Sequence, residues 1–214
     1  MISDSHGERI IADAGCIAEG AAWLVRAEPR FGPPIAAAGA LPLRLRPDGF
    51  GALLDAIVSQ QVSVASADAI MARLAAAGLT ERAAMAEAGD GALAACGLSR
   101  QKMRYCRALA LSGLDYAALR TAPSEAVIAT LTALPGIGRW TAEIYAMFSL
   151  GRADVFAAGD LALQQAARSL FALDARPPER VLRQMAEAWS PWRAVAARAL
   201  WAYYRMEKSR EGIR

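Results

Sequence analysis

A short glycine turn, LPGIG at residues 134–138, separates two segments of helix length. Gly136 and Gly138 follow Pro135 closely, and both residue types interrupt helices. The preceding segment predicts a helix that ends near Ala133, and the following segment predicts a helix that starts at about Gly138. The sequence therefore predicts a tight helix–hairpin–helix, whose glycines permit positive φ angles and close approach of a partner to the backbone.

The remainder of the chain is also helical in character. Hydrophobic residues make up 55% of its 214 residues, and many of them are alanine, the strongest helix former. We expect an all-α fold of roughly ten helices, with no strand and with an irregular proline-rich stretch at 31–49. The expected helices cover residues 16–28, 51–61, 63–78, 80–88, 90–96, 100–112, 124–133, 139–150, 160–173, 177–190 and 191–208.

Composition excludes several classes of protein. No apolar run reaches the roughly 20 residues of a membrane span, and residues 1–10 lack the pattern of a secretory signal, so we expect a cytoplasmic protein. The three cysteines (Cys16, Cys96 and Cys106) are odd in number and lack CxxC spacing, which argues against a disulfide framework or a structural zinc site. His6 is the one histidine, so histidine catalysis is nearly excluded.

Charge is distributed unevenly along the chain. The net charge is −3 for residues 1–100 and +6 for residues 101–214, within a total of +3. Only Lys102 and Lys208 are lysines, and the other basic residues are arginines. The basic half contains the glycine turn, which is compatible with a polyanionic partner but is weak support by itself.

The predicted hairpin offers two kinds of ion site. The second helix presents free N–H groups and its positive dipole end, which suit a phosphate, and Arg139 adds a charge beside them. Backbone carbonyls of Thr132, Leu134 and Ile137 could hold a monovalent cation that bridges to the same phosphate. The alternative is an ordinary turn between two helices, and the glycines alone favour that alternative.

A longer motif changes this balance. The stretch LPGIGRWTAEIYAMFSLGRADVFAAGDLAL, residues 134–163, joins the hairpin to a glycine-containing loop and an aspartate. In this it resembles the helix–hairpin–helix DNA glycosylase superfamily, and within it the DNA-3-methyladenine glycosylase II branch. Residues 56–74, 97–110 and 191–204 agree as well, in the family's order. The loop before the aspartate usually contains a proline, whereas here it reads Ala157-Ala158-Gly159.

The resemblance implies a two-domain helical fold with an interdomain cleft and without the extra N-terminal β domain of larger members. The discontinuous domain would comprise residues 1–46 and 157–214. The central domain would comprise residues 47–156 and contain the helix–hairpin–helix.

The resemblance also implies the roles of individual residues. Asp160 would be the catalytic carboxylate that stabilises an oxocarbenium-like sugar and orients water, although an aspartate there is also a favoured helix N-cap. Trp140 and Trp201 would line the base pocket, with Tyr145 and Leu161 as weaker candidates; core packing is the alternative for each tryptophan. The expected wedge, which fills the space left by a flipped base, is Gln61 with its neighbours Gln60 and Val62; helix capping or a surface turn is the alternative. The other expected DNA contacts are the hairpin residues Gly136, Gly138, Arg139 and Thr141. Arg139, Arg193 and Lys102 are candidates for phosphate contacts, and a solvated surface charge is the alternative for each.

The expected enzyme is a monofunctional glycosylase that removes alkylated bases of the 3-methyladenine and 7-methylguanine type from duplex DNA. Members that also nick DNA carry a lysine nucleophile where this chain has Trp140. No cofactor is expected beyond Na⁺ or K⁺ at the hairpin, and no iron–sulfur cluster. The alternatives are a non-catalytic DNA-binding module and a glycosylase for deaminated or oxidised bases. We expect a monomer that acts on nucleoid DNA in bacteria.

Overall fold

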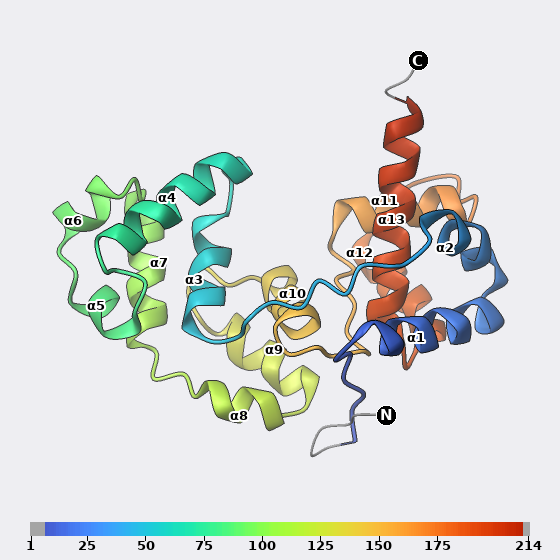
Figure 1. Cartoon of the computed structure of the whole chain (residues 1–214), viewed down its shortest axis with the longest axis horizontal. Coiled ribbons are helices and arrows are strands. Elements are labelled where there is room, and N and C mark those ends of the chain that lie inside the picture. Colours follow the sequence, from blue (N-terminus) through green and yellow to red (C-terminus); the bar gives the residue numbers. More distant parts are fainter. Residues whose placement is uncertain (1–6, 212–214) are drawn as a thin grey trace. The chain divides into compact units, whose positions relative to one another are not determined.

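The computed structural model describes residues 7–211 and is all-helical in that range (Figure 1), which confirms the expected fold class. His6 lies outside the described residues. One isolated antiparallel bridge joins Ile10 to Arg152. No helix in the described range is both long and apolar enough to cross a membrane.

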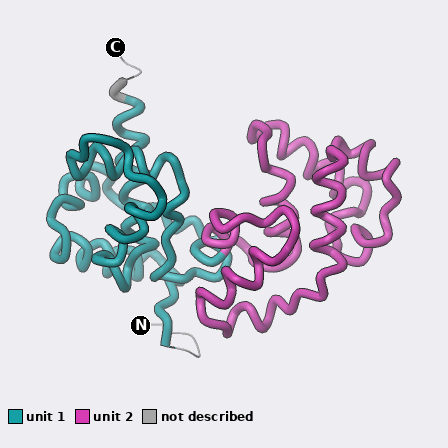
Figure 2. The backbone as a smooth tube through the Cα atoms, turned by 180° about the vertical axis from the view of Figure 1, so that it is seen from behind, with its two compact units in different colours: residues 1–45, 146–214 teal, residues 46–145 magenta. Residues whose placement is uncertain are grey.

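The chain divides into two compact units (Figure 2), residues 1–45 with 146–214 (unit 1) and residues 46–145 (unit 2). Unit 1 contains α1 (Ala14–Ala27), η1 (Pro29–Phe31), α2 (Gly32–Ala38), α11 (Leu161–Leu170), α12 (Glu179–Met185), η2 (Ala186–Trp189) and α13 (Arg193–Glu211). Unit 2 contains α3 (Phe50–Val58), α4 (Val64–Ala76), α5 (Arg82–Glu87), α6 (Asp90–Ala95), α7 (Arg100–Leu111), α8 (Tyr116–Thr121) and α9 (Ser124–Thr132). The boundary at 145/146 falls within α10 (Arg139–Phe148).

The second boundary differs from the expected one, because residues 146–156 belong to the discontinuous unit. Backbone hydrogen bonds attach this segment to the N-terminal part of the chain: Ile11 N donates to Gly151 O at 2.7 Å, and Ala153 N donates to Arg9 O at 3.0 Å. Such long-range pairing has no local signal in the sequence.

Local signals predicted most of the α-helices but missed two. Ser63 and Ser99, residues of a type favoured at helix N-caps, cap α4 and α7, each accepting a backbone N–H. The proline-rich stretch contains α2, which was not predicted from the sequence. This helix can form because its two prolines occupy the first turn, where no intrahelical N–H is needed. The short helix α8 was also missed; Asp115 caps it.

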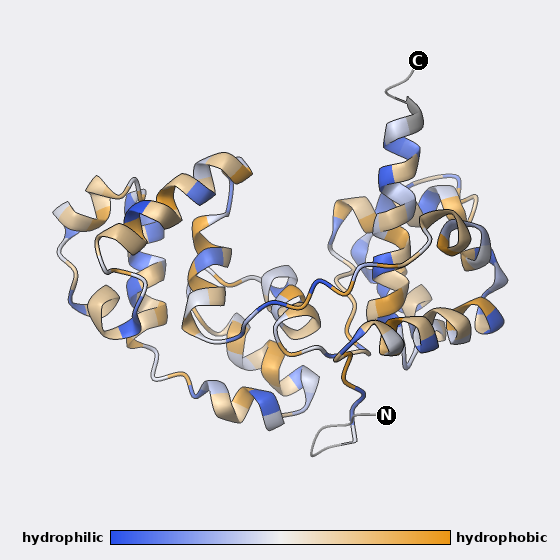
Figure 3. Cartoon of the chain, in the orientation of Figure 1, coloured by the Kyte–Doolittle hydropathy of each residue, from blue (hydrophilic) through white to orange (hydrophobic). Residues whose placement is uncertain are grey.

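Hydrophobic residues recur along the helices of both units (Figure 3), and most of the buried side chains in each unit are apolar. In unit 1, the ring of Trp189 lies 5.3–5.7 Å from those of Phe31, Phe156 and Phe171. Helix α1 approaches α13 so closely that a Cβ at Gly20 would lie 2.7 Å from Val195 of α13. In unit 2, α7 packs against α3 and α5. These two cores hold the hairpin and the aspartate of the long motif on separate units.

Candidate functional site

The predicted hairpin is present in unit 2. Leu134 N donates to Leu131 O and Ile137 N donates to Leu134 O, both at 3.1 Å, which closes the turn between α9 and α10. The two glycines differ: Gly136 has φ +88°, whereas Gly138 does not adopt a positive φ. A Cβ at Gly136 would lie 2.4 Å from the Tyr105 ring, and a Cβ at Gly138 would meet nothing within 4 Å. Glycine is therefore required by geometry at Gly136 only.

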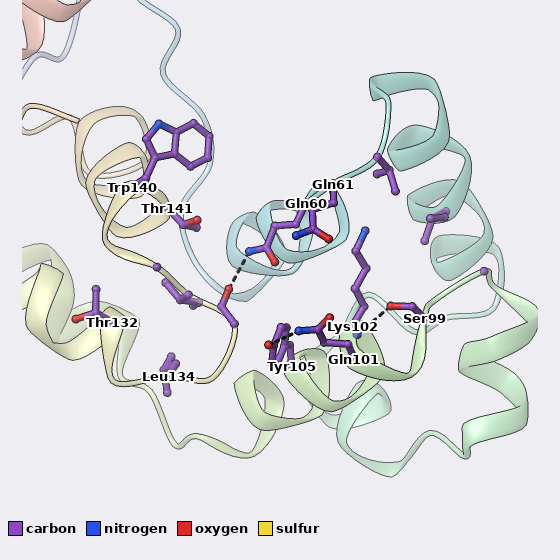
Figure 4. A pocket seen from close by; sticks show the side chains of 16 residues that line it. Gln60, Gln61, Ser99, Gln101, Lys102, Tyr105, Thr132, Leu134, Trp140 and Thr141 are labelled. Atoms are coloured by element: carbon purple, nitrogen blue, oxygen red, sulfur yellow. Dashed lines mark hydrogen bonds between the residues drawn. The ribbon is translucent and has the colours of Figure 1, made fainter. Parts of the chain in front are cut away.

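A pocket of about 820 Å³ opens beside this hairpin (Figure 4). It brings together most of the predicted DNA contacts and the three predicted carbonyl donors. Arg139 is not part of its lining. The pocket is lined by Gln60, Gln61, Val62, Ile70, Gly97, Ser99, Gln101, Lys102, Tyr105, Thr132, Leu134, Gly136, Ile137, Gly138, Trp140 and Thr141.

Sequence reasoning missed Tyr105 and Gln101 in this pocket. Tyr105 lies under Gly136, and Gln101 donates to the Tyr105 hydroxyl at 2.7 Å. Both belong to α7, whose 100–112 segment reads as an ordinary amphipathic helix. No local pattern distinguishes them from other helix surface residues.

The cations predicted to contact phosphate already have partners within the protein. Arg139 Nε donates to the buried Glu143 carboxylate at 2.9 Å. Arg193 makes a two-point contact with Asp154 at 2.7 and 3.0 Å. Lys102 Nζ donates to the Val58 carbonyl at 2.6 Å, and burial lowers the pKa of this lysine. A phosphate would have to compete with these contacts.

Asp160 lies in unit 1 at the start of α11. Its Oδ1 accepts from Ala162 N at 2.9 Å and Leu163 N at 3.0 Å, so the helix-cap interpretation is correct. The same oxygen accepts from Trp201 Nε1 on α13 at 3.2 Å. Three donors from two helices therefore orient this carboxylate.

The loop before Asp160 lacks the usual proline but is braced by another residue. The buried Gln164 donates through Nε2 to Ala158 O at 2.9 Å, and Asp160 N donates to Ala157 O at 2.9 Å. Gln164 was not predicted. The available signal was its position four residues after Asp160, from which a helical side chain can reach back to the preceding loop.

The four residues predicted to line the base pocket differ in environment. Trp201 is half-buried and lies 5.8 Å from the Phe148 ring, beside Asp160 in unit 1. Leu161 is 62% exposed in the first turn of α11. Trp140, in the first turn of α10 in unit 2, is 47% exposed. Tyr145 is buried, its hydroxyl accepts from Gly49 N at 3.0 Å, and burial raises its pKa to about 12, so its environment is that of a core residue.

The predicted ligands for a monovalent cation are backbone carbonyl oxygens at the hairpin. Among the described residues, no three His, Cys, Asp or Glu side chains gather at one point. The Leu134 carbonyl already accepts the Ile137 N–H, so it would offer a cation its second lone pair. The carbonyl donor set suits a weakly bound Na⁺ or K⁺ rather than a transition metal.

The family model of the HhH-GPD superfamily of base excision DNA repair proteins matches residues 54–191, and the chain belongs to this superfamily.

Two solved structures and one curated protein illustrate the similarity. A crystal structure of DNA-3-methyladenine glycosidase from Bacillus halodurans is 35% identical, with a TM-score of 0.79 over 87% of this chain and 89% of that one. The 3-methyladenine DNA glycosylase of Schizosaccharomyces pombe, solved with abasic DNA, is 25% identical, with a TM-score of 0.73 over 89% and 97% of the two chains. DNA-3-methyladenine glycosylase 2 of Escherichia coli is 31% identical over 72% of this chain and 57% of its own length.

The similarity to curated proteins covers only part of their length. The matches to two proteins of Schizosaccharomyces pombe span 52% and 49% of those proteins, and 50% of this chain in each case.

Proposed function

We propose that this chain is a monofunctional DNA glycosylase that hydrolyses the N-glycosidic bond of alkylated bases, of the 3-methyladenine and 7-methylguanine type, in duplex DNA. The observation that carries the proposal is the oriented carboxylate of Asp160, which accepts the Trp201 indole N–H and two helix N–H groups through one oxygen. The relatives named as 3-methyladenine glycosylases support the same activity.

Asp160 would act on the sugar. When the C1′–N bond breaks, its electron pair leaves with the base and positive charge develops on the sugar. A fixed carboxylate stabilises that charge electrostatically. Water then adds its oxygen to C1′ and loses a proton, which leaves an abasic site.

The alkylated base carries a positive charge that assists this reaction. The electron pair from the broken bond neutralises the cation, so the base leaves without a strong general acid. The exposed face of Trp140 and the half-exposed ring of Trp201 would each attract a cationic base by stacking and cation–π interaction, worth about 0.5–2 kcal/mol per contact.

The hairpin and the pocket beside it would hold the DNA. The N-terminal end of α10 offers backbone N–H groups to a phosphate, with a monovalent cation at the carbonyls of Thr132, Leu134 and Ile137. Gln61, exposed and in the turn between α3 and α4, would fill the space left by the flipped base. The protein would act as a monomer.

Base release from methylated DNA tests this proposal. Duplex DNA treated with a methylating agent is incubated with the protein, and free bases are separated by chromatography. We expect 3-methyladenine and 7-methylguanine to appear. Asp160→Asn should lower release about 100- to 1,000-fold while folding survives, because asparagine is an equally good N-cap.

Three outcomes would contradict the proposal in different ways. No free base from the native protein would leave the non-catalytic DNA-binding module. Retained turnover in Asp160→Asn would reject the catalytic role of this residue. Strand breaks without added alkali would show lyase activity, which is not expected because position 140 is tryptophan and not lysine.

A further inference from the structure

The end of α3 and the turn that follows it, residues 59–63, are each held by a side-chain contact within unit 2. Lys102 Nζ donates to the Val58 carbonyl at 2.6 Å, at the end of α3. Gln60 Nε2 donates to the Gly136 carbonyl at 2.8 Å (Figure 4). The end of α3 is thereby attached to α7, and the turn is attached to the hairpin.

The two glutamines of this turn have different environments. Gln60 is half-buried and engages the hairpin, whereas Gln61 is exposed and has φ +57°. A left-handed backbone is unfavourable for a residue other than glycine and persists only where the surroundings hold it. The side-chain contact of Gln60 lies next to this strained residue in the chain.

Gly136, the acceptor of that contact, is itself held firmly. Its φ of +88° directs the backbone over the Tyr105 ring, which leaves no room for a Cβ. The Gln60 amide fixes the carbonyl of the same residue. Gly136 is therefore placed by side chains from α7 and from the turn.

We propose that Gln60 is a positioning residue that couples the hairpin to the turn carrying Gln61, instead of contacting DNA. This rests on the proposed function, in which the hairpin holds a phosphate and Gln61 fills the vacated base position. Because one hydrogen bond joins the two segments, the position of the hairpin on the phosphate determines the position of the wedge. Phosphate binding and base displacement then depend on each other energetically.

Hydrogen–deuterium exchange of the DNA-free protein is the first test. Gln60→Met keeps the length of the side chain but has no donor. Loss of this hydrogen bond should raise exchange in peptides covering residues 134–140 about 3- to 10-fold. The matched control is Gln61→Met, the same change one residue along, which should leave these peptides unaffected. Unchanged exchange in Gln60→Met would overturn the proposal.

Gln60→Glu is a second variant, and it should make protection of the hairpin from exchange depend on pH. The ionised carboxylate cannot donate to the Gly136 carbonyl, whereas the protonated acid can. Hairpin protection, corrected for intrinsic exchange, should be low at pH 7 and recover toward the native value at about pH 4. A purely structural disruption would show no recovery at acid pH, and that result would reject the role of the donated hydrogen bond.

Coupling on DNA is measured by a double-mutant cycle. Gln61→Ala and Arg139→Ala are combined in the native and in the Gln60→Met background, and affinity for abasic duplex DNA is measured. The two changes should be non-additive in the native background and additive without Gln60. Equal coupling in both backgrounds would contradict the proposal. Because the exchange experiments need neither DNA nor catalysis, their result stands apart from any failure of the proposed glycosylase activity.

Discussion

At the scale of single residues, Trp201 has two separable properties, its ring and its N–H. The ring lies against Phe148, and the N–H lies 3.2 Å from Asp160 Oδ1. Trp201→Phe removes the donor and keeps an aromatic ring. We expect the single-turnover rate of base release to fall about 10-fold, the value of one hydrogen bond to a charged group.

Binding separates this positioning effect from general damage to the site. Affinity for abasic DNA should be nearly unchanged in Trp201→Phe, since the ring remains. An unaltered rate of release, measured with enzyme in excess, would show that the indole N–H does not orient Asp160 for the reaction.

At the scale of the hairpin element, substitution of Gly136 should impair folding stability, whereas substitution of Gly138 should impair DNA binding. Gly136→Ala places a Cβ in left-handed backbone and against the Tyr105 ring. It should lower the free energy of unfolding by about 2–4 kcal/mol. Urea denaturation followed by circular dichroism measures this loss.

Gly138→Ala is the matched change on the same hairpin. Its Cβ would meet no atom within 4 Å, so stability should change by less than about 1 kcal/mol. If a phosphate approaches the backbone here, the added methyl group should weaken duplex binding about 10-fold. Full affinity in this variant would argue that DNA does not touch the backbone at Gly138.

At the scale of the whole molecule, binding to DNA should depend strongly on salt. If the protein makes about three or four phosphate contacts, its affinity for DNA should fall roughly 40- to 150-fold when salt rises from 50 to 200 mM. Arg139 now pairs with Glu143, and if it exchanges that partner for phosphate, Arg139→Gln should reduce the slope of log affinity against log salt by about 1. Fluorescence anisotropy across a salt series measures the slope. An unaltered slope would show that Arg139 keeps its contact with Glu143 and does not bind a phosphate.

Stability of the whole molecule should fall in alkali. Burial raises the pKa of Cys106 to about 11 and that of Tyr145 to about 12. Each group is more readily ionised in the unfolded chain, so its contribution is complete below its ordinary pKa and is lost as pH rises through the folded value. Stability should therefore decline from about pH 9 to pH 12.

Urea denaturation at a series of pH values measures this decline. Cys106→Ala should remove the part between about pH 9 and 11, and Tyr145→Phe the part between about pH 10 and 12. A decline that is the same in both variants and in the native protein would assign it to other groups.

What the sequence determined by itself was the local structure. Alanine-rich segments, serine caps at Ser63 and Ser99 and the glycine turn specify helices and hairpin through interactions within a few residues. The resemblance over residues 134–163 added the family and its candidate residues, including Asp160. These features are readable because their causes lie close together in the chain.

Tertiary structure alone decided which side chains meet. Trp201 donates to Asp160 across 41 residues, and Gln60 reaches Gly136 across 76. Likewise Tyr105 decides that Gly136, and not Gly138, must be glycine. Hydrogen bonds and ring contacts between distant segments depend on how helices pack, and no local pattern in one sequence encodes that packing.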